Sequence, residues 1–492
     1  MLLVAGGAER PHAAGVSLMS YLTGTSQSQL GRIKESGTLR VLTRVDPTTY
    51  FEGSDGLTGL EYDLINQFAK RLGVKAEFIV PDSFERMIDM IAAGRADIAA
   101  AGLTVTEQRT NILRFTPPYQ KITEQIVYRS GKPHPRSIVD LTKGRLEVVK
   151  GTSHIETLEQ WKENIPKLKW HVNTELNNDE LLYRVANGRI DYTIADSNKI
   201  NLVKRFYPEL RVAFDLSNPR PLAWALPKSD DSSLYDEAAR FFEEIKQDNT
   251  LAQLIDRHYG HADALDDYSN RTFRKHVDRR LPEYRKHFQA AADRLGIDWR
   301  LLAAIGYQES HWHREAVSPT GVRGIMMLTS GTARDLGVRD RTDPAQSIDG
   351  GSRYFMERMT KISKKIPQPD RTWMALAAYN VGFGHLQDAR MLARKQGTNP
   401  DRWVDVKKYL LRLGKPRWHR QTKYGYARGW EPVRYVENIR YYYDLLVWLT
   451  EGKDRQQRNG RGTTTLRTWT ADRSMPADEL FAINVLNQTL AL

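Results

Sequence analysis

A single glutamate, Glu309, combines two features that suit acid–base chemistry. It ends the apolar segment 299–310, where helical spacing places it on one face with Leu302 and Ile305. Burial among apolar side chains and the negative end of a helix dipole both raise the pKa of a carboxyl group. A carboxyl that keeps its proton near neutral pH can act as a general acid. Taken alone, the same residue could also be an ordinary glutamate at a helix end, exposed or paired with a nearby arginine.

Three later segments carry side chains that could complete a site around Glu309. The loop SPTGVRGIMMLT can bring backbone donors close to a ligand, and it contains Met327. The helical segment WMALAAYN ends at Tyr379 and Asn380, just before two glycines. The helical segment EPVRYVENIRYYYDL carries Tyr435 on one face with apolar and aromatic residues. Each segment is a weak signal by itself, so the informative feature is their order along the chain.

That order is E-S at residues 309–310, then G-x-M, A-Y-N and a helical tyrosine. It resembles the lysozyme-like soluble lytic transglycosylases over about residues 281–450. The resemblance implies an all-α lysozyme-like domain that cleaves the β-1,4 bond between N-acetylmuramic acid and N-acetylglucosamine in peptidoglycan. In this family no external water attacks, so the products carry 1,6-anhydromuramic ends. The resemblance makes Glu309 first the acid and then the base of this lyase reaction.

The resemblance also implies which residues hold the sugar. Tyr379 and Tyr435 would position the site, and Ser310 and Asn380 would supply hydrogen bonds. Met327 is a departure, because many members read G-L-M-Q where this chain reads GIMM. A flexible thioether then stands in place of a hydrogen-bonding amide, which changes the expected contacts to the substrate more than it changes the chemistry.

The carboxylates near Glu309 agree with this chemistry. Most glycosidases use two carboxylates, yet no second Asp or Glu stands out in segments 318–329 and 373–385. A site with one carboxylate needs another way to stabilise the cation, and in the resembling family the N-acetyl group of the substrate is thought to assist. A hydrolysing muramidase is the alternative enzyme. The products distinguish the two, because an anhydro end is one water lighter than a reducing end.

The first half of the chain alternates between strand and helix patterns. TLRVLTRV, KAEFIV and DIAAAG are typical of strands, while EYDLINQFAKRLG and FERMIDMIAAG are typical of helices that end in glycine. Strands that alternate with helices predict βαβ units and a parallel sheet. From about residue 269 the strand signal disappears and helix follows helix. The sequence therefore predicts an α/β part followed by an all-α part.

Four residues of the α/β part are candidates for a ligand site. Thr104 and Arg109 follow a strand that ends in glycine. Thr152 opens a helix after another strand, and Asp196 ends a third strand at the sheet edge where such ligands bind. An arginine with a helix N-terminus suits a carboxylate, and an aspartate suits an ammonium group, which together describe an α-amino acid. Alternatively, Arg109 pairs with a surface acid and Thr152 only caps its helix.

The segments GLEYDLINQFAKRLG, AGRADIAAAGLTVTEQR and FTPPY resemble the family-3 extracellular solute-binding proteins that capture amino acids, over about residues 37–262. The resemblance implies two lobes joined by a hinge, with a ligand held in the cleft by the four residues above. Tyr50 and Phe51 would add an apolar wall. The expected ligand is a free amino acid or a muropeptide, whose peptide stem carries the same groups. Because the module is attached to an enzyme, we expect its ligand to regulate that enzyme.

The expected organisation has four parts: a leader over residues 1–36, a solute-binding domain over 37–268, a lytic transglycosylase domain over 269–452 and a polar tail over 453–492. Lys and Arg number 73 against 60 Asp and Glu, a net charge of +13 that suits an anionic wall and envelope. The charges lie in mixed-sign runs, so nucleic acid is not an expected partner. Cysteine is absent, and neither a metal nor a cofactor is expected.

The location of the protein follows from the resemblance. No run of the sequence approaches the ~20 apolar residues of a membrane-spanning helix, and the N-terminus is a poor signal peptide as written. The resemblance implies peripheral attachment at the periplasmic face of the outer membrane. A rival of another class is a binding or sensor protein with a degenerate helical domain. The intact Glu309, Tyr379, Asn380 and Tyr435 argue against that rival.

Overall fold

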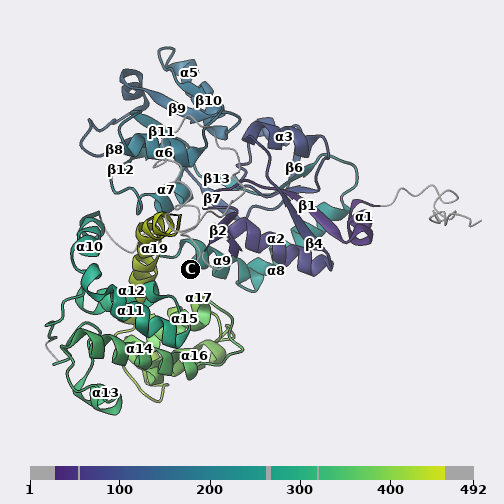
Figure 1. The fold of residues 1–492 in the computed structure, drawn as a ribbon. Coiled ribbons are helices and arrows are strands. Elements are labelled where there is room, and N and C mark those ends of the chain that lie inside the picture. The colour runs from purple at the N-terminus through teal and green to yellow at the C-terminus, as the bar shows by residue number, and fades with distance from the viewer. Residues whose placement is uncertain (1–27, 54–55, 262–266, 319–320, 460–492) are drawn as a thin grey trace, which may run out of the picture.

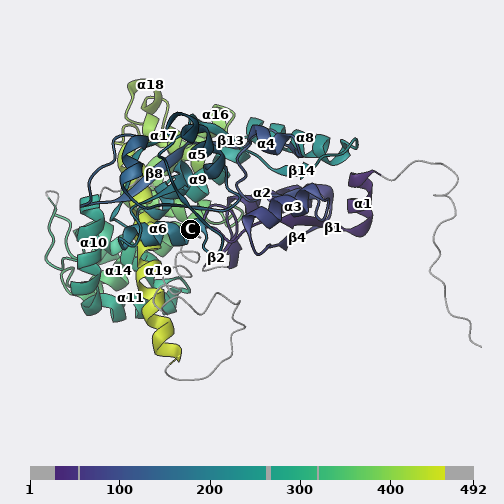
Figure 2. The same cartoon turned by 90° about the horizontal axis from the view of Figure 1, so that it is seen from above.

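The computed structural model describes residues 28–53, 56–261, 267–318 and 321–459. Figures 1 and 2 show a two-lobed α/β half, coloured purple to teal, beside a helical half, coloured green to yellow. The last helix of the helical half, α19, lies at the boundary between the two halves. The fold class predicted from the sequence, a two-lobed α/β part followed by an all-α part, is confirmed.

The first lobe is built on a five-stranded sheet in the order β4-β1-β5-β14-β6. Its strands are β1 (Thr38–Leu42), β4 (Lys75–Ile79), β5 (Ile98–Ala99), β6 (Leu113–Phe115) and β14 (Ala225–Pro227), and a small hairpin joins β2 (Phe51–Gly53) to β3 (Gly56–Thr58). Its helices are α1 (Gln29–Ser36), α2 (Leu60–Leu72), α3 (Phe84–Ala92), α4 (Glu107–Thr110), α8 (Ser233–Gln247) and α9 (Thr250–Tyr259). Helix α2 buries one apolar face and ends at Gly73, whose φ of 74° favours glycine.

The second lobe has a five-stranded sheet in the order β10-β9-β11-β8-β12. Its strands are β8 (Glu124–Arg129), β9 (Leu146–Val149), β10 (His171–Asn173), β11 (Tyr192–Asp196) and β12 (Leu210–Asp215). Its helices are the 3₁₀ helix η2 (Ile138–Lys143), α5 (Ser153–Asn164), α6 (Asn178–Ala186) and α7 (Ser197–Val203). The chain crosses between the lobes at β7 (Gln120–Ile122) and β13 (Arg220–Leu222), which pair with each other. These two crossings are the hinge that the sequence resemblance implied.

Both sheets are mixed, which corrects the prediction of a purely parallel sheet. Strand β1 is parallel to β4 and β5, and β9 is parallel to β10 and β11. In contrast, β14 is antiparallel to β5 and β6, and β8 is antiparallel to β11 and β12. A parallel pair needs a crossover, usually a helix, between its two strands. Strands β8 and β14 each follow a crossing between the lobes, so no such helix precedes them in their sheet.

The helical half packs around α12 and α19. Its helices are α10 (Asp267–Arg279), α11 (Leu281–Leu295), α12 (Trp299–Ser310), α13 (Ser330–Asp335), α14 (Pro344–Thr360), α15 (Asp370–Val381), α16 (Phe383–Lys395), α17 (Trp403–Arg412), α18 (Pro416–His419) and α19 (Trp430–Asn459). Helix α19 contacts α12, α15 and α17. Its residues Val436, Ile439 and Leu446 are fully buried in the core. The prediction that helix follows helix from about residue 269 is confirmed.

Buried charges join the helical half to the α/β half. On α19, Asp444 Oδ2 lies 2.7 Å from Arg205 of the second lobe and 2.7 Å from His261. Arg440, one turn earlier, donates to the carbonyls of Asp256 and Arg257 at the end of α9, at 2.9 Å and 2.8 Å. All of these except Arg257 are buried. One helix of the helical half is therefore fixed to both lobes.

The ends of the folded region differ from the expected division. Helix α1 begins at Gln29, and its Leu30 N–H donates to the Ser233 hydroxyl at the start of α8 at 3.1 Å. The α/β half therefore begins before the expected boundary at residue 37. Helix α19 extends to Asn459, past the expected start of the tail at 453, and residues 460–492 lie outside the described residues. In the described part of the chain, no helix combines the length and the apolar character needed to cross a membrane.

Candidate functional site

The last turn of α12 is built to hold Glu309 in a fixed position. Asp298 caps the start of the helix by accepting a backbone N–H of the first turn at 2.8 Å. The chain leaves the helix through His311 and Trp312, whose φ angles are 53° and 55°. Trp312 is buried, and its indole N–H donates to the carbonyl of Ala303 at 2.8 Å. The chain therefore folds back onto α12 directly after Glu309.

Glu309 is mostly buried and receives a hydrogen bond from another helix. The Tyr435 hydroxyl on α19 donates to Glu309 Oε1 at 2.5 Å. Burial raises the pKa of Glu309 to about 7, although the hydrogen bond from Tyr435 acts in the opposite direction. The predicted rise in this pKa is confirmed, with desolvation as its main cause. The carboxyl can therefore hold or release a proton near neutral pH.

Ser310 and Tyr379 hold the GIMM loop against the end of α12. The Ser310 hydroxyl donates to the carbonyl of Ile325, and the Tyr379 hydroxyl donates to that of Met326, both at 2.9 Å. Met327 follows with a φ of 48°, a conformation that few non-glycine residues adopt, and its side chain is partly exposed. The hydroxyl protons of Ser310 and Tyr379 are directed to the protein backbone. Both residues are thus placed to support the loop.

Asn380 and Tyr435 meet at a cavity beside Glu309. The rings of Tyr379 and Tyr435 stack, with centroids 6.3 Å apart and planes at 16°. Asn380 is exposed and lines a cavity of about 320 Å³ together with Tyr435 and Gln308, the residue before Glu309. The structure therefore brings the residues predicted from the four separate motifs into one region, with Tyr435 in direct contact with Glu309.

Another carboxylate of this region, Glu431, has a different environment from that of Glu309. The carboxylate that lines the same cavity, Glu431, is paired with Arg428 at 2.8 Å. Among the described residues, burial and the Tyr435 hydrogen bond account for the pKa of Glu309. A second carboxylate close by would add a charge effect of its own. That Glu309 acts without a second carboxylate stays a prediction from the sequence.

The residues predicted to bind a ligand in the α/β half meet between the two lobes. Arg109 is buried, and its guanidinium donates at 3.0 Å to the carbonyl of Thr104 and at 3.0 Å to that of Gly151, which belong to different lobes. Burial lowers the pKa of Arg109, and the charges of Glu156 and Asp196 oppose that effect. Glu156 lies 3.7 Å from Arg109. Arg109 therefore bridges the lobes and also has an acidic partner.

Asp196 and Thr152 have protein partners as well. His154 Nε2 lies 3.1 Å from Asp196 Oδ1. The Thr152 hydroxyl donates to the carbonyl of Val149 at 2.8 Å, and Thr152 precedes α5 without capping it through its side chain. A ligand at this place would have to compete with these contacts for the polar groups of Arg109 and Asp196.

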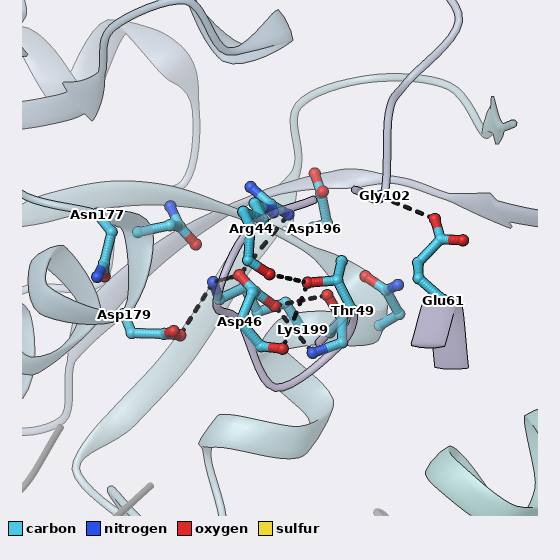
Figure 3. Close-up of polar contacts among 12 residues, drawn as sticks. Arg44, Asp46, Thr49, Glu61, Gly102, Asn177, Asp179, Asp196 and Lys199 are labelled. Carbon is cyan, nitrogen blue, oxygen red and sulfur yellow. Dashed lines mark hydrogen bonds and ion pairs between the residues drawn. The ribbon is translucent and has the colours of Figure 1, made fainter. Parts of the chain in front are cut away.

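Lys199 forms an ionic cluster in the cleft that sequence reasoning missed (Figure 3). Its ammonium pairs with Asp46 of the first lobe and, at 3.0 Å, with Asp179 of the second. All three side chains are buried, and Arg44 lies 3.7 Å from Asp46. Burial alone would raise the pKa of Asp46, but the charges of Lys199 and Arg44 lower it overall. The available signal was a lysine in the first turn of the short helix that follows Asp196.

A cavity of about 350 Å³ lies in the cleft and is lined from both lobes. The first lobe contributes Arg44 and Phe84, and the second contributes Thr152, Asn173 and Asn177. Its volume is within the range of about 300–1,000 Å³ that is usual for small-molecule sites. The cleft therefore has room for a small-molecule ligand, and Thr152 is the predicted ligand residue that lines it.

The apolar wall predicted from Tyr50 and Phe51 does not line this cavity. Phe51 is buried in the hydrophobic core, and the Tyr50 ring stacks on Phe78 with centroids 5.1 Å apart. The alternation of side chains along β2 sends Phe51 inward. Phe84 is the aromatic residue that lines the cavity instead.

One group of described residues has side chains that could hold a metal ion. Donor atoms of Glu124, His154 and Asp196 lie within 4.8 Å of one another. Glu124 already accepts from the Ser153 hydroxyl at 2.6 Å, and Arg220 lies 3.5 Å from it. The Glu124 carboxylate thus already has a hydroxyl donor and a nearby arginine charge. These three residues therefore fit a hydrogen-bonded network better than a metal centre.

Comparison with known proteins covers both halves. Residues 39–261 match the family of bacterial extracellular solute-binding proteins, family 3, and residues 286–401 match the transglycosylase SLT domain. The chain is 49% identical to "Membrane-bound lytic murein transglycosylase F 1" of Alkalilimnicola ehrlichii, over 87% of each chain. It is 46% identical to "Membrane-bound lytic murein transglycosylase F" of Pseudomonas fluorescens Pf-5, over 89% of this chain and 90% of that one.

Solved structures similar to this chain match the α/β half. An ancestral arginine-binding protein bound to arginine is 27% identical and covers 45% of this chain and 97% of its own, with a TM-score of 0.41. The ancestral amino acid-binding protein AncCDT-1 is 28% identical and covers 47% of this chain and 100% of its own, with a TM-score of 0.42.

Proposed function

The chain belongs to the membrane-bound lytic murein transglycosylase F family, and we propose that Glu309 performs the acid and base steps of its reaction. Its SLT domain makes it a lytic transglycosylase that acts on peptidoglycan. The main support for this proposal is that burial raises the pKa of the Glu309 carboxyl to about 7. A group with its pKa near the working pH can both donate and accept a proton in one cycle.

The proposed reaction has two steps. In the first, Glu309 donates its proton to the glycosidic oxygen that joins N-acetylmuramic acid to the next sugar, and the bond from C1 to that oxygen breaks. The N-acetyl oxygen of the same muramic acid stabilises the positive charge at C1 by bonding to it. In the second step, the 6-hydroxyl of that sugar attacks C1 and displaces the N-acetyl oxygen. The Glu309 carboxylate takes the hydroxyl proton, which restores the acid and closes the 1,6-anhydro ring.

The neighbouring residues support this cycle in different ways. Tyr435 donates a hydrogen bond to Glu309 and so orients the carboxyl between its two tasks. Tyr379 and Ser310 act through the loop that they hold. Asn380, exposed at the cavity, is the side chain available to hydrogen-bond the substrate. Met327 contributes a thioether contact at the position where an amide was expected from the family pattern.

Product analysis of the Glu309→Gln variant tests this function. The amide is close in shape and cannot transfer the proton, so we expect cleavage of purified peptidoglycan to fall by roughly 10²–10⁴-fold. Wild type should release muropeptides with 1,6-anhydro ends, each one water lighter than a hydrated product. If the mass spectra showed only hydrated reducing ends, the enzyme would be a hydrolase and the proposed transglycosylase reaction would be wrong. Near wild-type turnover by Glu309→Gln would remove Glu309 from the acid role.

We further propose that the cleft of the α/β half binds a free amino acid or a muropeptide and that this binding changes the rate of cleavage. The cavity between the lobes supports the first part, because both lobes line it and its volume is within the usual range of small-molecule sites. The contacts of α19 with both lobes support the second part, because α19 also carries Tyr435. A ligand changes the rate only if it binds one arrangement of the lobes better than another.

Calorimetric titration with muropeptides and single amino acids tests the regulatory proposal. We expect binding to wild type and weaker binding to Arg109→Ala, with a parallel change in cleavage rate. Coupling of this kind typically changes the affinity of a site by roughly 5–150-fold. Leu411→Ala, an exposed residue of α17, is the control. If no ligand binds, or if binding leaves cleavage unchanged, the α/β half is better described as a tether for the substrate.

We propose that the protein works at the periplasmic face of the outer membrane, held peripherally. The names of its relatives include the term membrane-bound, and peptidoglycan lies next to that membrane. Fractionation of the envelope, followed by washing with high salt and then with detergent, tests the proposal. Recovery of the protein with the inner membrane would contradict it.

A further inference from the structure

Three large aromatic side chains stand exposed where the chain runs from α18 into α19, and the last of them is the first residue of α19. Tyr424, Tyr426 and Trp430 are 53%, 57% and 57% exposed. Exposed aromatic rings lack the stabilisation that burial of such large apolar surfaces would give. Neighbouring exposed apolar groups on a soluble surface commonly mark a binding site.

The exposure of Tyr424 is built into the fold. The buried carboxylate of Asp388 on α16 accepts the backbone N–H groups of Lys423 and Tyr424, at 3.1 Å and 2.9 Å. The Tyr424 ring lies on Gly384, where a Cβ would come within 2.8 Å of three ring atoms. One face of the ring is therefore packed on a glycine and the ring is held in one place.

The rest of the loop is anchored in the same way. Ala427 and Gly429 are buried on the end of α17, and a Cβ on Gly429 would lie 1.5 Å from the Leu410 carbonyl oxygen. The exposed Tyr426 and Trp430 alternate with these two anchors. Figure 2 shows α16, α17 and α18 together at one edge of the helical half. The aromatic rings thus project from a rigid support, as a preorganised binding surface requires.

This surface continues directly into the catalytic region. Trp430 lines the 320 Å³ cavity that also contains Asn380 and Tyr435, and Tyr435 bonds to Glu309. Gly384, under the Tyr424 ring, lies near the start of α16, the helix that follows the one ending after Asn380. Asn438 also lines the cavity. The cavity thus offers an aromatic side chain, that of Trp430, and the amides of Asn380 and Asn438 to the same ligand.

The geometry points to a sugar-binding subsite formed by Trp430, with Tyr424 and Tyr426, that holds the glycan strand beyond the bond that Glu309 cleaves. A pyranose ring presents a face of C–H groups, whose partial positive charge suits the negative face of an aromatic ring. Its edge presents hydroxyl and N-acetyl groups, which Asn438 and Asn380 can bond. The occupant is the strand of the enzyme's own substrate, so this inference rests on the proposed function of Glu309.

Oligosaccharide binding in a non-cleaving background tests the subsite apart from catalysis. In the Glu309→Gln variant, we would titrate N-acetylglucosamine oligomers of two, four and six sugars and follow the heat of binding. Trp430→Ala and Tyr424→Ala should each weaken binding of the six-sugar oligomer by about threefold to tenfold, the effect of losing one aromatic contact. The two-sugar oligomer should be affected less. Trp430→Phe, which keeps a flat ring, should restore most of the affinity.

Cleavage by the otherwise intact enzyme gives a second readout. Trp430→Ala should raise KM for long glycan strands while kcat changes little, because the ring does not touch the reacting atoms. Trp161→Ala, which removes a 39% exposed indole from the α/β half, is the matched control and should leave both constants unchanged. Unchanged oligomer affinity in Trp430→Ala with an unchanged melting temperature would overturn the subsite, whatever the role of Glu309. A lower kcat at constant KM, without rescue by Trp430→Phe, would also overturn it.

Discussion

At the scale of single residues, the pKa of Glu309 sets a pH dependence. The carboxyl is protonated below its pKa of about 7, and the first step needs the proton, so kcat/KM should fall as the pH rises above that value. The Tyr435 hydrogen bond lowers this pKa. We therefore expect Tyr435→Phe to move the falling limb of the pH–rate profile to higher pH. A limb that stays in place would mean that another group titrates there.

The same pKa predicts a change in stability. In the unfolded chain the Glu309 carboxyl titrates near 4.5, and in the folded protein near 7. Between these values the folded state binds more protons, so this residue lowers the stability of the fold as the pH rises through that window, by up to about 3 kcal/mol. The uncharged amide of Glu309→Gln does not carry this cost. Chemical denaturation should show the variant to be more stable than wild type at pH 8 and about equal to it at pH 4.

At the scale of elements, the GIMM loop depends on a glycine. Gly324 has a φ of 84°, and a Cβ at this position would lie 1.8 Å from the carbonyl oxygen of Arg341. Gly324→Ala must displace the loop that Ser310 and Tyr379 hold, so we expect it to lower kcat and to destabilise the fold by more than the ~1 kcal/mol of backbone strain alone. Gly321→Ala is a matched control, with a φ of 79° and open space around it. Equal losses of activity in both variants would rule out the contact with Arg341 as the cause.

The helices were easier to predict from the sequence than the sheets and the ionic contacts. Helix α12 carries its own cap, apolar face and C-terminal reversal within about fifteen residues, so its pattern predicts both its bounds and the burial of Glu309. The direction of β8 and β14 depends on chain crossings far away, which local patterns do not encode. The Lys199–Asp46 pair joins residues more than a hundred positions apart and leaves only a lysine in the short helix after Asp196 as a signal.

At the scale of the whole molecule, Asp444 holds the two halves together. It is fully buried and lies 2.7 Å from Arg205, which is itself buried. Asp444→Asn leaves Arg205 buried without a counter-charge, a loss that typically costs about 3–5 kcal/mol. We expect a large fall in the midpoint of chemical denaturation. Glu357→Gln, which removes an exposed partner of Lys361, is the control and should cost at most about 0.5 kcal/mol.

The contacts of α19 also limit how the protein can be divided. Each half resembles a separate family, which suggests two modules that could be cut apart or exchanged with relatives. Yet Arg440 and Asp444 of α19 bond to residues of the α/β half. The Trp448 ring of the same helix packs against Phe206, with centroids 5.8 Å apart. A catalytic fragment cut before α10 would lack the partners of Arg440 and Asp444 in the α/β half. It would also lack Phe206, which packs against the indole of Trp448. Any chimera that joins this helical half to another binding module must therefore bring along the matching residues of α9 and of the Arg205–Phe206 segment.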